Sequence, residues 1–518
     1  MTRWSFLAAL AVVLPSVSAA QDTTAAQMVQ PAASLTLDDA LKTARANNPQ
    51  FRQFLNNTDP ARWGVRNAYG SLLPSFSTSA GLNYTGAGQA NYGSGLTRQT
   101  SGLMGSSYQA GFQWQIDGAK LTAPAQQKAN QRATEEDIAS QGIALKQAIT
   151  DQYLTTIQAT GQVAVARQQV ERNKSFLDLA NAKYRVGQGT LLEVRQAEVQ
   201  KGQADIDLLR NRQLENEAKL ELFRRMGVTP PVPVEQVALT DTFAVREPVF
   251  SLDSLLTLAE EQNPSLLAVR ERAHSAGLGV QSARSAYLPS LALQAGWSGF
   301  TQKSTNESLL LAQALSSGQA TASNCTFQNQ VVQGLTYGPG GIPGQPNGGI
   351  IPDCNAFAGL NSSGTALDPA VAQQLHDANS KYPFHFTSQP FQASLMISLP
   401  IFTGFSRSLR LSQARAQQKN ADEDVRARGL QIQSDINAAY LQLRTAYEAI
   451  GVQLANRDAA RDQLRLAQDR YRLGSGTSLE VSDAQNAVQR AEGDYVNSVA
   501  TYQKAFAALE GAVGRPLR

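Results

Sequence analysis

"AKYRVGQGTLLEV" (Ala182–Val194) and "DRYRLGSGTSLEV" (Asp469–Val481) are two copies of one short stretch of sequence. Both contain Tyr-Arg, an aliphatic residue, Gly-x-Gly-Thr and a later Glu-Val. Each copy lies inside long polar segments that contain few glycines or prolines. Because glycine ends a helix and lets the chain reverse, we predict that the two stretches are the tips of two antiparallel helix pairs.

The segment before the second tip has the pattern of a very long helix. From Arg407 to Leu473 it contains no proline, and Gly429 and Gly451 are its only glycines. Its apolar residues recur at steps of four and three, as in a coiled-coil seam: Ile432, Ile436, Ala439, Leu443, Ala446 and Ile450. A helix of this length would measure about 100 Å, which is too long for a compact globular domain.

The repeated tips belong to a larger duplication. "TLDDALKTARANNPQF" from Thr36 resembles "SLDSLLTLAEEQNPSL" from Ser251, and a "LPS" triplet follows in both copies. We therefore expect two tandem structural repeats, residues 21–227 and 251–518, joined by a Pro-rich linker at 228–250. Each repeat should contain a helix, two β-strands and a long helical hairpin. The second repeat carries an insertion, predicted to be a long extracellular loop at about residues 300–389.

Four segments alternate apolar and polar residues, which predicts β-strands. They are residues 76–84, 108–116, 291–298 and 391–401. One apolar and one polar face over such a length is typical of a transmembrane β-barrel strand. A half-buried strand of a soluble protein has the same pattern, but four such segments in an exported chain favour the barrel.

The N-terminus has the layout of a secretory signal peptide at residues 1–20. Arg3 precedes the apolar run Phe6–Leu14, and small residues follow at 17–20; a short buried helix is the alternative. Export would place Cys325 and Cys354, the only two cysteines, in an oxidising compartment, which favours a disulfide between them over two free thiols. The three histidines have no zinc-ligand spacing with these cysteines, so we expect no metal site.

Composition excludes other classes. A net charge of +3 with 17% charged residues lacks the basic excess of a nucleic-acid-binding protein. No Walker loop, His-Glu-x-x-His motif, nucleophile elbow or catalytic cysteine pattern is present, so we predict neither an enzyme nor a cofactor. Since a membrane forbids an open sheet edge, four strands per chain require oligomerisation. A homotrimer would close twelve strands around a pore, with the helices continuing as a tube.

From Leu35 to Leu517 the chain resembles the TolC family of outer-membrane efflux proteins. The resemblance rests on the duplicated layout, on "NNP" and "QNP", on "LPS", and on the tips "YRVGQGT" and "YRLGSGTSLEVSDAQ". It implies an α+β membrane protein: a trimeric 12-stranded outer-membrane β-barrel continuing into a long periplasmic α-helical barrel.

The implied function is that of a passive exit duct in a tripartite efflux or type I secretion system. It would work with a periplasmic adaptor and an inner-membrane pump, in contact with outer-membrane lipid. The alternative that the residues leave open is a periplasmic or surface coiled-coil scaffold without transport activity.

The resemblance also implies a periplasmic gate near the second tip. Glu480 and Asp483 occupy the positions of acidic residues that ring the entrance in the family. Tyr471 and Glu193 match a tyrosine and an acidic residue that tie neighbouring hairpins shut. Gly476 stands where the family has an arginine, which predicts a looser or differently held gate. The alternative for Glu480 is a solvated acid near a helix N-terminus, where the helix dipole favours a negative charge.

The family uses the hairpin tips to contact adaptor hairpins. The expected contact residues are Val186, Gly187, Gly189, Thr190, Leu473, Gly474, Gly476 and Thr477. The alternative is that these glycines serve only the turns.

Overall fold

The computed structural model describes residues 34–91, 97–241, 243–334 and 350–517. The predicted signal peptide, residues 1–20, lies outside them. The chain divides into two compact units. The first comprises the residues up to 61, residues 130–273 and those from 420 onward, and the second comprises residues 62–129 and 274–419.

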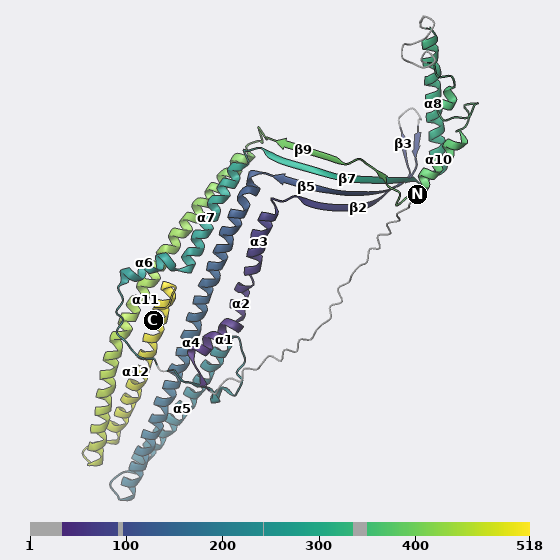
Figure 1. The fold of residues 1–518 in the computed structure, drawn as a ribbon. Coiled ribbons are helices and arrows are strands. Elements are labelled where there is room, and N and C mark those ends of the chain that lie inside the picture. The colour runs from purple at the N-terminus through teal and green to yellow at the C-terminus, as the bar shows by residue number, and fades with distance from the viewer. Residues whose placement is uncertain (1–33, 92–96, 242, 335–349, 518) are drawn as a thin grey trace, which may run out of the picture. The chain divides into compact units, whose positions relative to one another are not determined.

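Two long helical hairpins account for most of the first unit (Figure 1). In one, α4 (Gly118–Arg185) is followed by α5 (Leu191–Met226). In the other, α11 (Ser406–Arg472) is followed by α12 (Ser478–Val513). The N-terminal parts of α4 and α11 belong to the second unit. The predicted helices and the two reversals between them are confirmed.

Each reversal uses a glycine in the left-handed region of backbone conformation. Gly187 and Gly474 both have φ of +76°, a value at which a side chain would be strained. Thr190 and Thr477 then cap α5 and α12, since the side chain of each accepts a hydrogen bond from the backbone N–H three residues later. The repeated Gly-x-Gly-Thr is therefore a helix stop followed by a helix start.

The apolar seam predicted on α11 forms a core in the first unit. Its isoleucines and leucines pack against α12 and against α6 (Leu252–Gln262). The members of this core that are at most 3% exposed are Leu255, Ala259, Leu266, Ile436, Leu443, Tyr502, Ala505, Leu509 and Val513. A second core lies around Tyr153 of α4, between α5 and α1 (Leu37–Asn47).

Each repeat begins with more than the single helix expected from the sequence. Asn48 separates α1 from α2 (Pro49–Leu55), with α3 (Thr58–Gly70) beyond, and Asn263 separates α6 from α7 (Pro264–Ser285). The reason is the Asn-Pro pair, because the residue before a proline is disfavoured in the α conformation.

The two Asn-Pro landmarks tie each repeat's first helices to the end of its hairpin. Asn48 Nδ2 donates a hydrogen bond to the carbonyl oxygen of Arg225 at 2.7 Å. Asn263 Nδ2 donates to that of Ala512 at 3.0 Å. The duplication in sequence thus corresponds to a duplicated contact at the C-terminal ends of α5 and α12.

The linker at 228–250 contributes structure that the sequence did not reveal. It contains the short helix η1 (Val234–Gln236) and the strand β6 (Ala238–Leu239). β6 pairs in parallel with β1 (Ser34–Leu35), so the linker returns to the start of the first repeat.

The second unit is built on one antiparallel sheet (Figure 1). Its long strands are β2 (Ser75–Thr85), β5 (Leu103–Ile116), β7 (Ser290–Ser304) and β9 (Gln392–Ser398). β2 pairs with β5, β5 with β7, and β7 with both β9 and the short β8 (Thr387–Ser388). All four predicted strands are present, although β9 is shorter than the predicted segment.

The expected loop at 300–389 contains helices that the sequence did not reveal. After β7 come α8 (Glu307–Gly334), α9 (Cys354–Phe357) and α10 (Pro369–Ser380). The glycines and prolines that suggested a loop cluster at 338–349, outside the described residues, whereas α8 itself is rich in Leu, Ala and Gln. A smaller hairpin, β3 (Gly88–Asn91) with β4 (Thr97–Thr100), follows β2.

Candidate functional site

The predicted gate residues lie where the two hairpins meet near their tips. Tyr471, on the last turn of α11, is 3% exposed and packs in a core with Phe176 of α4, their ring centres 5.4 Å apart. Burial raises the pKa of Tyr471, and the nearby carboxylate of Glu193 raises it further. Tyr471 and Glu193 therefore lie near each other on different hairpins of the same chain, but the buried Tyr471 hydroxyl has no hydrogen-bond partner among the described residues. The Glu193 carboxylate instead accepts a hydrogen bond from the Thr190 N–H at 3.2 Å.

Lys183 of α4 makes a contact between the hairpins that the sequence did not suggest. Its Nζ lies 4.0 Å from the centre of the Tyr471 ring and also donates a hydrogen bond to the Tyr471 carbonyl oxygen. An ammonium over an aromatic ring is attracted by its electron-rich face. In this chain a lysine from the first hairpin therefore holds the end of α11.

Gly476 is packed too closely for a side chain to be added freely. A Cβ at this position would lie 3.0 Å from both Arg470 Cβ and Tyr471 N. The arginine that the family has here would require the turn to shift. The cation next to the second tip comes instead from Arg470, whose Nη1 lies 3.4 Å from Glu480 Oε2.

The two acidic residues differ in their surroundings. Glu480 lies in the first turn of α12, and its backbone N–H donates to Thr477 Oγ1 at 3.2 Å. The helix dipole favours a negative charge at this position, and Glu480 is in addition paired with Arg470 of its own hairpin. Asp483 is exposed on the following turn.

Above the tips, buried polar contacts join the two hairpins. The carboxylate of Glu492 on α12, whose side chain is 6% exposed, accepts from Arg172 of α4 at 3.1 Å and from Arg461 of α11 at 2.8 Å. Burial lowers the pKa of Arg172 despite this pairing. Gln200 Nε2 of α5 donates to Ser482 Oγ of α12 at 2.5 Å. These contacts link residues far apart in sequence, so no local pattern indicated them.

The predicted adaptor-contact residues form two exposed turns. Val186 and Leu473, at equivalent positions, are 69% and 83% exposed. A Cβ at Gly187 or Gly474 would meet no atom within 4 Å. Space around these turns is therefore open, and their glycines are required by backbone conformation. At Gly189 and Gly476, in contrast, an added Cβ would lie close to atoms in the last turn of the preceding helix.

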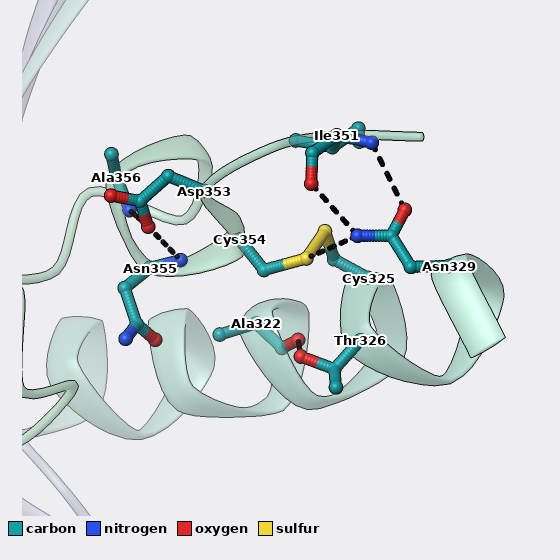
Figure 2. The surroundings of a disulfide bond; sticks show 9 residues. All are labelled: Ala322, Cys325, Thr326, Asn329, Ile351, Asp353, Cys354, Asn355 and Ala356. Atoms are coloured by element: carbon teal, nitrogen blue, oxygen red, sulfur yellow. Dashed lines mark hydrogen bonds between the residues drawn. A yellow bond between two sulfur atoms is a disulfide. The ribbon is translucent and has the colours of Figure 1, made fainter. Parts of the chain in front are cut away.

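Cys325 and Cys354 form a disulfide that ties α8 to α9 (Figure 2). Asn329, one turn after Cys325, donates to the Ile351 carbonyl oxygen at 2.8 Å and accepts from the Ile351 N–H at 3.0 Å. Asp353 caps α9 through the N–H groups of Asn355 and Ala356. Hydrogen bonds on both sides therefore fix the segment that carries Cys354.

Two other kinds of site are absent from the described part of the chain. No group of three or more His, Cys, Asp or Glu side chains there is placed to hold a metal ion. No helix in that part combines the length and apolar character needed to cross a membrane.

A profile of outer membrane efflux proteins matches residues 40–228 and 350–515. The chain belongs to this family. Outer membrane protein TolC of Vibrio cholerae is 26% identical over 264 residues, which are 50% of this chain and 57% of TolC. The chain thus matches little more than half the length of this curated relative. Family membership confirms the expected location, the outer membrane, with the helical part in the periplasm.

Solved outer-membrane proteins share the fold. VceC of Vibrio cholerae has a TM-score of 0.64 at 16% identity, covering 93% of this chain and 97% of its own. CmeC of Campylobacter jejuni has a TM-score of 0.65 at 14% identity, covering 92% and 85%. MtrE of Neisseria gonorrhoeae, solved in its open state, has a TM-score of 0.62 at 17% identity, covering 93% and 89%.

Proposed function

We propose that three copies of this chain form an outer-membrane exit duct. The observation that carries the proposal is a membrane-type sheet with two open edges: among the described strands, β2 bonds only to β5, and β9 only to β7. Lipid offers no partner for the N–H and C=O groups of such edges. Pairing β2 of one copy with β9 of the next would close a twelve-stranded barrel, which continues into the periplasmic α-helical barrel.

The apolar face of the sheet supports a position in lipid. Five of its large side chains are 58–75% exposed in the single chain: Phe76, Leu82, Tyr84, Leu395 and Ile397. An outward apolar band of this kind is what a transmembrane barrel presents to the bilayer. A coiled-coil scaffold without transport would leave this surface in water, so the scaffold alternative is not favoured.

The helices support assembly in the same way. Leu209 and Leu214 of α5 and Leu441 and Leu466 of α11 are 56–63% exposed. Exposed apolar side chains along a long helix favour burial against another helix. Neighbouring copies in a trimer would supply that helix.

The duct would receive its cargo from an inner-membrane pump through a periplasmic adaptor, and would pass it outward without a catalytic step or cofactor of its own. A trimer presents six hairpin tips of two similar kinds, and hence six similar docking points for the adaptor. The exposed Val186 and Leu473 and the open space at Gly187 and Gly474 suit such contacts.

The periplasmic mouth would be the gate. Glu480 and Asp483 of three copies would place six carboxylates around the axis. Two unit charges about 8 Å apart repel by roughly 2 kcal/mol at an effective dielectric constant near 20. Contacts between hairpins must oppose that repulsion, and the Tyr471 environment, with Lys183 and Glu193, provides them.

Paired substitutions on the two faces of β9 test the proposal. Leu395→Arg on the apolar face should cost roughly 2–4 kcal/mol near the bilayer midplane and reduce the trimer recovered from outer membranes. Ser394→Arg, its neighbour on the polar face, should leave trimer yield near that of the native chain. Native protein in planar bilayers should conduct. Equal loss of trimer in both variants, or a non-conducting monomer, would contradict the duct.

A further inference from the structure

The polar face of the sheet has a defined hollow. Its residues follow from the register in which β2, β5, β7 and β9 lie side by side (Figure 1). One row across the strands is Ser75, Gln113, Gln294 and Ser394, and the next is Ser77, Gly111, Gly296 and Gln392. The row after that contains Ser79, Gln109 and Ser298. A hollow on the sheet is lined by members of all three rows.

Two glycines form the floor of this hollow. Gly111 and Gly296 are direct partners on β5 and β7, so bare backbone lies between the longer side chains around them. A Cβ at Gly111 would approach the Ala295 carbonyl oxygen to 2.9 Å, and one at Gly296 would approach that of Ala110 to 2.5 Å. Substitution at either position would therefore disturb the strand pairing as well as fill the hollow.

The rim consists of uncharged hydrogen-bonding groups. Four amides surround the glycines, from Gln109 and Gln113 of β5, Gln294 of β7 and Gln392 of β9. Each amide offers two donor hydrogens and an acceptor oxygen. Serines of β2, β7 and β9 add hydroxyl groups. The residues that alternate with these polar ones also touch the hollow, and by the register their side chains belong to the opposite face: Phe112, Ala295, Trp297, Phe391 and Ala393. The amides and hydroxyls match the donors and acceptors of a neutral polar molecule and supply no counter-charge to an ion.

One aromatic ring lies on the same face beyond the hollow. Phe300 follows Ser298 by two residues, so it shares the polar face, and it is 45% exposed. By the same register the exposed side chains of Phe76 and Trp297 belong to the opposite face, although Trp297 also touches the hollow. A polar hollow with one apolar ring beside it presents both kinds of surface that a sugar has, hydroxyl edges and an apolar ring face.

We propose that this hollow is a binding site for neutral polyhydroxylated molecules, of the oligosaccharide class, on the wall of the duct. The inference rests on the proposed function only in placing the hollow along the path of cargo. Binding itself requires the sheet alone. In a trimer the wall would carry three such sites, through which neutral, hydrogen-bonding cargo would pass with transient contacts.

Saturation-transfer difference NMR with maltohexaose tests this, using the full-length protein in a detergent that contains no sugar. The native protein should give a saturation-transfer signal. The double variant Gln113→Ala/Gln294→Ala should bind about tenfold more weakly, and Phe300→Ala should lose transfer to the sugar ring protons. Gln302→Ala removes an amide from the same face outside the hollow and should bind as the native protein does.

Two results would overturn the inference: absence of transfer to maltohexaose in the native protein, or an equal loss in Gln302→Ala. Tighter binding of a sulfated oligosaccharide of the same length would also overturn it, because charge would then dominate recognition. Conductance of the same preparation in planar bilayers is measured separately. A protein that binds the sugar but does not conduct would refute the duct while leaving the site intact.

Discussion

Replacing Lys183 with methionine removes a cation that joins the two hairpins near their tips and keeps an unbranched side chain of similar length. The change abolishes the ammonium–ring contact with Tyr471, 4.0 Å from the ring centre, and the hydrogen bond to its carbonyl oxygen. A cation–aromatic contact contributes about 0.5–2 kcal/mol, and a hydrogen bond from a charged group about 1.5–3 kcal/mol. Lys183 is only partly buried, so solvent screening reduces the expected sum to about 1–3 kcal/mol per chain.

If opening breaks this contact in one chain, the ratio of open to closed channels should rise about 5–150-fold. Single-channel recording in planar bilayers measures that ratio as open probability. Lys183→Arg keeps the charge and should preserve most of the closure. Lys201→Met is the matched control, because Lys201 pairs with Asp205 on the same helix, at 2.7 Å and partly exposed. The reasoning fails if Lys183→Met leaves open probability at the native value, or if Lys201→Met raises it equally.

Three further predictions concern charge. Asp483→Ala should halve the carboxylates at the mouth and weaken both cation selectivity and block by divalent cations from the periplasmic side, measured as reversal potential and blocked current. Glu492→Ala should cost about 1.5–3 kcal/mol, because it removes a charged hydrogen bond from the partly buried Arg172, and urea denaturation measures this loss. Glu307 raises the pKa of His376, so their contact between α8 and α10 should be complete below the ordinary histidine pKa of 6.5 and lost as pH rises through the raised value. NMR titration of His376 should therefore give a midpoint above 6.5.

Each of these has a control. Asp462→Ala removes an exposed acid that pairs with Arg465 on its own helix and should leave cation selectivity intact. Unchanged selectivity in Asp483→Ala would mean that Asp483 is a solvated residue on the helix surface and does not line the mouth. Glu448→Ala breaks an exposed pair with Arg444 and should lower the free energy of unfolding by less than about 1 kcal/mol. If Glu448→Ala and Glu492→Ala destabilise the protein equally, the burial of Glu492 does not strengthen its ion pairs. Glu307→Gln should return the His376 midpoint toward 6.5, and an unaltered midpoint would assign the shift elsewhere.

The parts of the fold that were predictable are those that a local pattern specifies. A left-handed glycine followed by a capping threonine requires a helix stop and start, which located both tips to within a residue or two. Alternation of period two placed the strands, since a one-residue slip would put every apolar side chain on the wrong face. The seam from Ile432 to Ile450 identified the core of α11 because its spacing matches a helix.

What the sequence did not reveal depends on contacts between distant residues or on composition averaged over too long a window. Lys183 and Tyr471 are held together by the packing of two hairpins, and nothing beside either residue indicates its partner. The repeat offers one clue, because Lys183 is equivalent to Arg470, so each tip carries a cation. Helix α8 was missed because the glycines and prolines at 338–349 dominated the composition of the whole insertion.

Electron cryomicroscopy of the protein in lipid nanodiscs would show directly how many chains form the barrel. We expect three chains around one axis, with β2 of each chain hydrogen-bonded to β9 of the next, so that twelve strands close a pore. A particle with another number of chains, or one in which the β2 and β9 edges meet no neighbouring strand, would contradict it.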